Sequence, residues 1–148
     1  VAILTGEYKN NLDEKGRVSF PAKLRTSLGG TAVTITRGVD KCLWVFPKDA
    51  WNVFLEKVMS QASLFQAQSR SVLRRLVAPA QEVEIDKQGR ISIPQSLREY
   101  AGLEKECLVL GISKYLEIWS VDGYEAYLKE SETDFLKAAE ALGNVCFG

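Results

Sequence analysis

Histidine is absent from the 148-residue sequence. Its absence removes the most frequent general base, the most frequent zinc ligand and every Ser-His or Cys-His catalytic pair. The three cysteines, Cys42, Cys107 and Cys146, are an odd and widely spaced set, which argues against a disulfide framework and for a reducing compartment. We therefore expect no catalytic residues, no metal site and no cofactor, and we expect that the protein is not an enzyme and has no small-molecule substrate.

Long apolar runs are also lacking. No stretch approaches the roughly 18–20 residues of a membrane-spanning helix, and residues 1–11 have neither the basic start nor the apolar stretch of a signal peptide. We expect no membrane partner. Apolar residues make up 46% of the chain and charged residues 26%, which is typical of a globular domain and excludes a disordered chain.

Net charge is zero, with 19 basic and 19 acidic residues, but the charge is unevenly placed. Residues 1–75 hold 12 basic and 6 acidic residues (net +6), and residues 76–148 hold 7 basic and 13 acidic ones (net −6). A neutral total argues against general coating of nucleic acid and for a localised contact.

The sequence contains an internal repeat. Residues 13–25 read DEKGRVSFPAKLR and residues 86–98 read DKQGRISIPQSLR, with 7 identities in 13 positions at an offset of 73. The same offset places Gly38 on Gly111 and Leu43 on Leu116, and we expect it to hold without a gap. A repeat of half the chain has a thin core by itself, so the two copies are expected to pack together with pseudo-two-fold symmetry.

Each copy predicts a short β-rich unit followed by helix. Asp and Gly in D-x-x-G favour a tight turn, alternating residues on either side favour strands, and the proline favours a helix start. The sequence does not decide whether the large apolar residues Trp51, Phe54 and Phe65 face the core or another chain. The predicted strands are 6–12, 17–20, 32–36, 43–46, 80–85, 90–93, 107–111 and 116–119, and the predicted helices are 22–27, 49–61, 64–77, 95–101 and 123–142.

The motif D-x-x-G-R-[VI]-x-[FI]-P-x-x-L-R is similar to that of the AbrB-like swapped-hairpin family, and its tandem arrangement resembles the MraZ family. The resemblance implies a β-rich α+β fold with two AbrB/MazE-like swapped-hairpin β-barrel repeats in pseudo-two-fold symmetry. It places the first repeat at 7–50, a helical connector at 51–79, the second repeat at 80–123 and a C-terminal helix at 124–148.

The resemblance also implies a function. The implied protein is a sequence-specific repressor of the division and cell-wall gene cluster that binds repeated promoter boxes in double-stranded DNA. It would act as a ring-shaped homo-oligomer in the cytoplasm, associated with the nucleoid. The alternative is an AbrB-fold protein-interaction module, antitoxin-like or a scaffold, in which the turns are only structural.

Arginine reads guanine through paired hydrogen bonds, and a turn before a strand fixes the direction of such a side chain. Residues 9–25 have net charge +3 and residues 82–98 have net charge 0, so we expect Arg17 and Lys15 to dominate DNA contact and Arg90 to be mainly structural. The candidate DNA-binding residues are Lys9, Lys15, Arg17, Lys23, Lys87 and Arg90, and the turn-forming residues are Asp13, Gly16, Asp86 and Gly89.

Each arginine also has a structural interpretation. An arginine after the turn can simply pair with the aspartate of that turn, and Arg25 and Arg98 are expected to pair with an aspartate or a chain end. The arginines at 70, 74 and 75 either form a second phosphate-binding stripe or meet the acidic second half, within the chain or across subunits.

Overall fold

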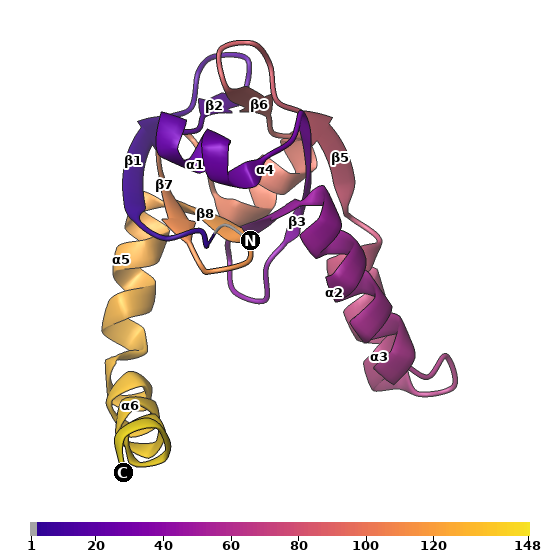
Figure 1. The fold of residues 1–148 in the computed structure, drawn as a ribbon, viewed down its shortest axis with the longest axis vertical. Coiled ribbons are helices and arrows are strands. Elements are labelled where there is room, and N and C mark those ends of the chain that lie inside the picture. The colour runs from indigo at the N-terminus through magenta and orange to yellow at the C-terminus, as the bar shows by residue number, and fades with distance from the viewer. Residues whose placement is uncertain (1–2) are drawn as a thin grey trace.

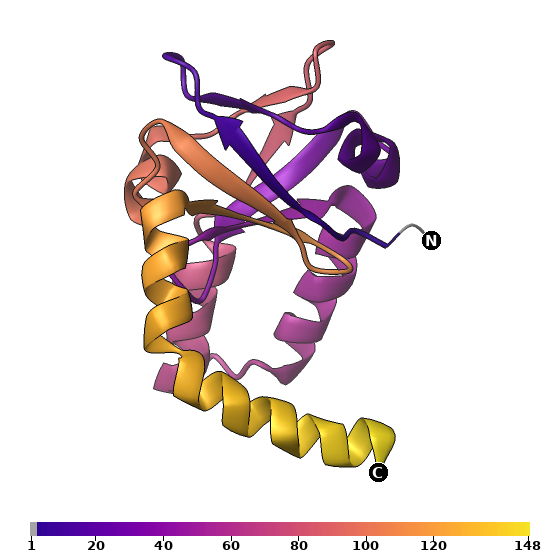
Figure 2. The same ribbon diagram turned by 90° about the vertical axis from the view of Figure 1, so that its left-hand side faces the viewer.

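Over residues 3–148, which the computed structural model describes, the chain folds into one body with two helical extensions (Figures 1 and 2). The elements are, in order, β1 (Glu7–Asn11), β2 (Arg17–Ser19), α1 (Ala22–Leu28), β3 (Ala32–Arg37), β4 (Leu43–Pro47), α2 (Lys48–Gln61), α3 (Ala67–Val72), the π-helix η1 (Leu73–Val77), β5 (Gln81–Glu84), β6 (Arg90–Ser92), α4 (Gln95–Ala101), β7 (Glu106–Gly111), β8 (Leu116–Ser120), α5 (Val121–Glu130) and α6 (Glu132–Phe147).

The two repeats exchange strands. A six-stranded antiparallel sheet has the order β1-β7-β8-β4-β3-β5, and β2 pairs with β6 in a second sheet. The first strand of each repeat therefore pairs with the other repeat, β1 with β7 and β5 with β3. Contacts of β1 with β2 and of β5 with β6 join the sheets. The β-rich α+β fold with two swapped-hairpin repeats is confirmed.

Strand register confirms the pseudo-two-fold relation. In the β2–β6 pair, Val18 lies opposite its own equivalent Ile91, and in the β4–β8 pair Trp44 lies opposite its own equivalent Glu117. An antiparallel pair centred on equivalent residues is what a two-fold axis between them produces. Glu117 accepts hydrogen bonds from the Trp44 and Trp119 indoles, each at 3.0 Å. The bond from Trp44 crosses from β4 to β8, so a side-chain contact also holds this strand pair together.

The core is formed from the same positions in both repeats. The apolar residues of the motif are buried, and α1 and α4 each bury the apolar side chains of one face. Each of these helices begins after a proline and ends at a left-handed glycine, Gly29 at φ 69° and Gly102 at φ 65°. The main cluster contains Val18, Phe20, Leu24, Ile91, Ile93 and Leu97, all nearly fully buried.

The expectation of a gapless repeat is wrong at one place. β3 begins at Ala32 and β7 at Glu106, an offset of 74, whereas β4 and β8 return to 73. The second repeat has one more residue between its short helix and the next strand, and one fewer in the following hairpin turn. Gly38 and Gly111 are therefore not equivalent. Gly111 ends β7, where a Cβ would lie 2.5 Å from the Thr5 backbone.

Two predicted helices are interrupted. The segment 64–77 becomes helical only at Ala67, and its last turn is π-helical, with the Ala78 amide donating to the Leu73 carbonyl. The segment 123–142 is two helices, because Ser131 (φ −95°, ψ 0°) breaks the run and its hydroxyl donates to the Tyr127 carbonyl.

The three large apolar residues left open by the sequence separate into two groups. Trp51 is buried, and Phe54 packs against Trp44 and Phe46, so both belong to the molecule's own aromatic cluster. Phe65, between α2 and α3, is 96% exposed.

No helix in residues 3–148 combines the length and apolarity that crossing a bilayer requires.

Candidate nucleic-acid interface

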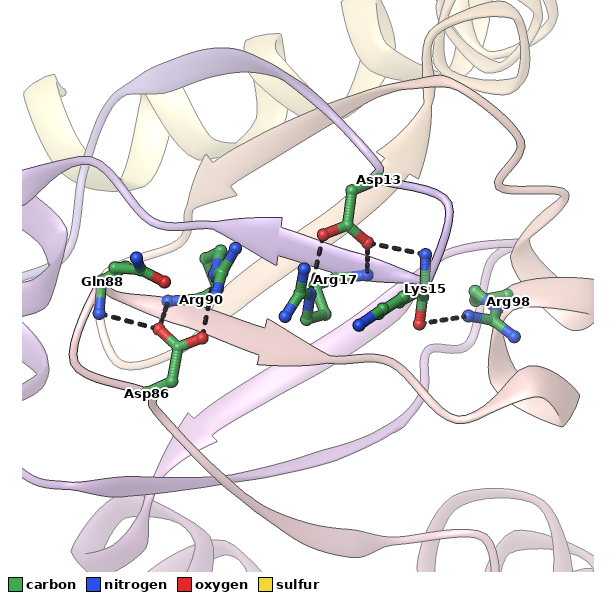
Figure 3. Close-up of polar contacts among 7 residues, drawn as sticks. All are labelled: Asp13, Lys15, Arg17, Asp86, Gln88, Arg90 and Arg98. Carbon is green, nitrogen blue, oxygen red and sulfur yellow. Dashed lines mark hydrogen bonds and ion pairs between the residues drawn. The ribbon is translucent and has the colours of Figure 1, made fainter.

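The first turn is organised by one carboxylate. Asp13 Oδ1 accepts from the amides of Lys15 and Arg17 at 2.9 and 2.8 Å, and the Gly16 amide donates to the Asp13 carbonyl at 3.0 Å. The Asp13 amide in turn donates to the Arg17 carbonyl at 2.9 Å. Gly16 has φ 77°, a left-handed conformation that favours glycine. The D-x-x-G motif therefore forms the predicted turn through local hydrogen bonds (Figure 3).

The same carboxylate orients the arginine. Arg17 Nε donates to Asp13 Oδ2 at 2.7 Å, while the side chain stays 27% exposed. Within residues 3–148, no hydrogen bond to protein engages the two terminal nitrogens of this guanidinium. The Asp13–Arg17 ion pair that the structural interpretation expects is therefore present. This pair uses only Nε, so both Nη groups remain available to an acceptor outside the chain.

The second turn repeats this arrangement. Asp86 Oδ1 accepts from the amides of Gln88 and Arg90, both at 2.9 Å, and Arg90 Nε donates to Asp86 Oδ2 at 2.9 Å. Gly89 also has φ 77°, and the Arg90 side chain is 29% exposed. The local geometry therefore does not show whether Arg17 and Arg90 differ in role, with one contacting DNA bases and the other only stabilising its turn.

Hydrogen bonding shifts the titration of both turn carboxylates. The Arg17 amide, followed by the Arg17 side chain and the Lys15 amide, holds the pKa of Asp13 below its usual range against the opposing effect of desolvation. The Arg90 amide and side chain and the Gln88 amide act in the same way on the pKa of Asp86. Both carboxylates are therefore charged, and both ion pairs intact, at neutral pH.

Each turn is supported by the opposite repeat. The Phe20 amide donates to the Gly89 carbonyl and the Ile93 amide to the Gly16 carbonyl, both at 2.9 Å. A Cβ on Gly16 would lie 1.2 Å from Arg98 Nη1, and a Cβ on Gly89 would lie 2.2 Å from Arg25 Cδ. The two-turn surface is consequently a product of both repeats and does not exist in one alone.

Arg25 and Arg98 correct a prediction. The structure gives neither an ion pair within residues 3–148. Instead Arg98 Nη1 lies 3.5 Å from the Lys15 carbonyl, and Arg25 lies against the Gly89 turn. The sequence contained one usable signal, the equal spacing of these arginines in the two copies. The swapped hairpins were expected from the family resemblance, but the contact of each arginine with the other repeat's turn was not.

Strand register places the two reading candidates on one face. Arg17 lies opposite Ser92 and Arg90 opposite Ser19 in the β2–β6 pair, whereas the central residues of the pair are buried. Side chains alternate along a strand, so the arginines and serines share the outer face. The two turns project together beyond this pair at one end of the molecule (Figures 1 and 2).

The lysines are distributed around this face. Lys15 and Lys87 lie at the two turn tips and are exposed. Lys9 lies on β1 and lines a shallow groove of about 490 Å³ with Arg25. Lys23 is exposed on α1. The structure thus gathers Lys15, Arg17, Lys87 and Arg90, with Lys9 and Lys23 beside the first repeat.

The cysteines do not form a second site. In the described part of the chain no three His, Cys, Asp or Glu side chains gather as metal ligands. Cys42 and Cys107 are buried singly, and Cys146 is exposed on α6. Burial raises the pKa of the Cys107 thiol to about 11, so this thiol is protonated at neutral pH.

The fold and the paired turns define a class of protein: a tandem swapped-hairpin barrel in which two arginine turns share one exposed face. A family model described as "MraZ protein, putative antitoxin-like" matches twice, at residues 3–75 and 76–145. The chain belongs to the MraZ family.

Several curated relatives match over nearly their whole length, each named "Transcriptional regulator MraZ". The relative from Treponema denticola is 61% identical over 144 residues, 97% of this chain and 100% of its own. One from Treponema pallidum is 55% identical over 142 residues, 96% of this chain and 95% of its own. One from Natranaerobius thermophilus is 42% identical over 140 residues, 95% of this chain and 96% of its own.

Proposed function

We propose that the protein is a transcriptional regulator that binds double-stranded DNA through the surface formed by its two turns. The observation that carries the proposal is the pair of partly exposed guanidinium groups, each oriented through Nε by an aspartate. Within residues 3–148, the terminal nitrogens of neither group make a hydrogen bond. A bidentate contact to guanine O6 and N7 needs two parallel N–H groups, which an arginine fixed in this way can present. The names of the relatives support the same assignment.

The finer proposal concerns target and assembly. We infer a repressor of the division and cell-wall gene cluster that recognises repeated promoter boxes as a homo-oligomeric ring, in the cytoplasm and at the nucleoid. One two-turn surface on a neutral chain is a small electrostatic contact, and several copies holding several boxes together gain avidity. The first repeat supplies most of the phosphate attraction, through Lys9, Lys15 and Lys23.

The competing function is a protein-interaction module. The Asp13–Arg17 and Asp86–Arg90 pairs are compatible with it, because each explains its arginine without a ligand. The description of the matching family model as antitoxin-like points the same way. The two functions differ in their response to salt. DNA binding releases counterions, so the logarithm of its affinity falls linearly with the logarithm of the salt concentration.

The test is the affinity of the full chain for a labelled duplex from upstream of its own gene, against a scrambled duplex, over a range of salt concentrations. We expect tighter binding to the upstream duplex and a negative salt slope. Arg17→Lys is the matched variant, because lysine keeps the charge and loses the fork. It should retain binding to the scrambled duplex and lose preference for the upstream one. Equal, salt-independent binding to both duplexes would exclude the proposal.

A further inference from the structure

A second cationic surface lies away from the turns. A groove of about 840 Å³ opens between the β3–β4 turn, η1 and α4, and it is lined by Arg37, Lys41 and Arg75 around Tyr100. Arg37 Cζ and Lys41 Nζ lie 5.1 and 4.5 Å from the centroid of the Tyr100 ring. The ring is fixed, because its hydroxyl donates to the Gly38 carbonyl at 2.9 Å. We call this surface the basic groove.

The cations of the basic groove have no carboxylate partner within residues 3–148. Glu99 also lines the groove, but the ion pairs of the described chain are those of the two turns. Arg37 Nε is buried and makes no hydrogen bond. The three cations outnumber the one carboxylate that lines the groove and repel one another, and a buried N–H without an acceptor is costly. Both observations indicate that an acidic group from outside completes the groove.

The basic groove also has an apolar border. Val39 and Val72 line it and are 72% and 43% exposed, and Leu76 also lines it. The exposed Arg74 follows on η1. None of the residues that line the groove belongs to the two turns, so a DNA duplex on the turns does not account for them. A partner with both carboxylates and apolar side chains suits this surface.

A segment with both carboxylates and exposed apolar side chains exists at the C-terminal end of the same chain. Residues 121–148, which form α5 and α6, hold six acidic and two basic residues, net −4. We call them the acidic arm. The apolar side chains of α6 are more than half exposed, with Phe147 at 92%. On a helix of 3.6 residues per turn, Phe135, Leu142 and Val145 share one face, and Glu132 and Asp134 border it.

The acidic arm does not reach the basic groove of its own chain. Figure 1 shows α6 at the far end of one extension and α3 on the other, and no ion pair joins the two. Within the described residues, no ion pair joins the arginines at 70, 74 and 75 to the acidic second half of the same chain.

We propose that the basic groove of one copy receives the acidic arm of a second copy. Carboxylates of the arm neutralise Arg37, Lys41 and Arg75, while its apolar face covers the Val39–Val72 border. The contact is heterologous, because it joins unlike surfaces, and repetition of such a contact closes a ring when the rotation permits. The inference rests on the proposed homo-oligomer and names the surfaces that build it. It also explains why a neutral chain has halves of opposite charge.

The test uses two charge-reversal variants of the full chain. One carries Arg74→Glu and Arg75→Glu, and the other Glu132→Lys and Asp134→Lys. Each places like charges together, so light scattering should show a loss of oligomer mass and roughly tenfold or more weaker assembly. In an equimolar mixture every groove can meet an arm of opposite charge, and the mass should return. Lys105→Glu with Lys114→Glu is the control, with the net charge of the arginine variant, and should keep the wild-type mass.

Other outcomes overturn the inference in distinguishable ways. If the wild type is a larger assembly and the Arg74/Arg75 variant keeps its mass, the groove is not the interface, although the ring stands. If the wild type is a monomer, the inference and the proposed ring both fail. If the arginine variant loses mass and the mixture does not regain it, another partner fills the groove. Stabilisation of the wild type alone by inorganic pyrophosphate would then identify a small-anion site.

Discussion

The two turns use the same five hydrogen bonds but lie in different electrostatic surroundings. In each, the aspartate binds two amides and the arginine Nε, the glycine amide closes the turn, and the aspartate amide meets the arginine carbonyl. The segment around the first turn has net charge +3, and the segment around the second has net charge 0. The hydrogen bonds that orient the arginine are therefore the same in both turns. The positive charge that attracts DNA phosphates differs between them.

The largest effect is expected from removing the arginines one at a time. Arg17→Ala should weaken binding to the upstream duplex by about 1–3 kcal/mol, the range for one bidentate arginine–guanine contact. Arg90→Ala should cost less, because fewer cations hold phosphates beside it. Fluorescence anisotropy with the two variants side by side measures this difference. Equal losses, or a larger loss for Arg90→Ala, would show that geometry and not local charge decides which turn reads DNA.

A smaller effect is expected from the turn glycines, measured as stability in urea. Gly16→Ala and Gly89→Ala both place a side chain at φ 77°, which costs about 1–2 kcal/mol for an L-residue. The steric part differs, because Gly16 faces the end of Arg98 and Gly89 faces the middle of Arg25. The guanidinium end swings away more easily, so Gly89→Ala should be the more destabilising.

A double-mutant cycle isolates that steric part. Arg25→Ala should reduce the cost of Gly89→Ala more than Arg98→Ala reduces the cost of Gly16→Ala. If removing either arginine leaves both glycine costs unchanged, the contacts across the repeats do not constrain the turns.

The sequence was sufficient for whatever is local in the site. Asp13, Gly16 and Arg17 form their turn through bonds spanning at most four residues, so the residue types alone predict it. Similarly, Pro21 and Gly29 delimit a short helix through their own backbone preferences.

What the sequence did not contain is non-local. The positions of Arg25 and Arg98 depend on how the swapped hairpins pack, which the family resemblance implied only as a fold and no spacing within one repeat encodes. The shift of one residue at β7 was hidden because Gly38 and Gly111 coincide at offset 73 for unrelated reasons. One follows a strand, and the other lets the Thr5 backbone pass.

The smallest effect is expected from acid, and here the two turns should behave alike. Because the pKa values of Asp13 and Asp86 are lowered in the folded state, each carboxylate contributes stability that is present above its unfolded pKa of about 3.9 and is lost as the pH falls through the folded pKa. Asp13→Asn keeps an oxygen for the two amides and loses the charge and the acceptor for Arg17 Nε. It should therefore be less stable than the wild type near neutral pH, and the difference should narrow as the pH falls below about 3.9 and close below the lowered pKa of the folded state.

Asp86→Asn should give the same curve, since its partners and distances match those of Asp13. Urea unfolding over a pH series measures both variants. A difference confined to Asp13→Asn would mean that the surplus of positive charge around the first turn stabilises its carboxylate beyond the shared hydrogen bonds. The electrostatic asymmetry assigned above to DNA binding would then also act on the fold.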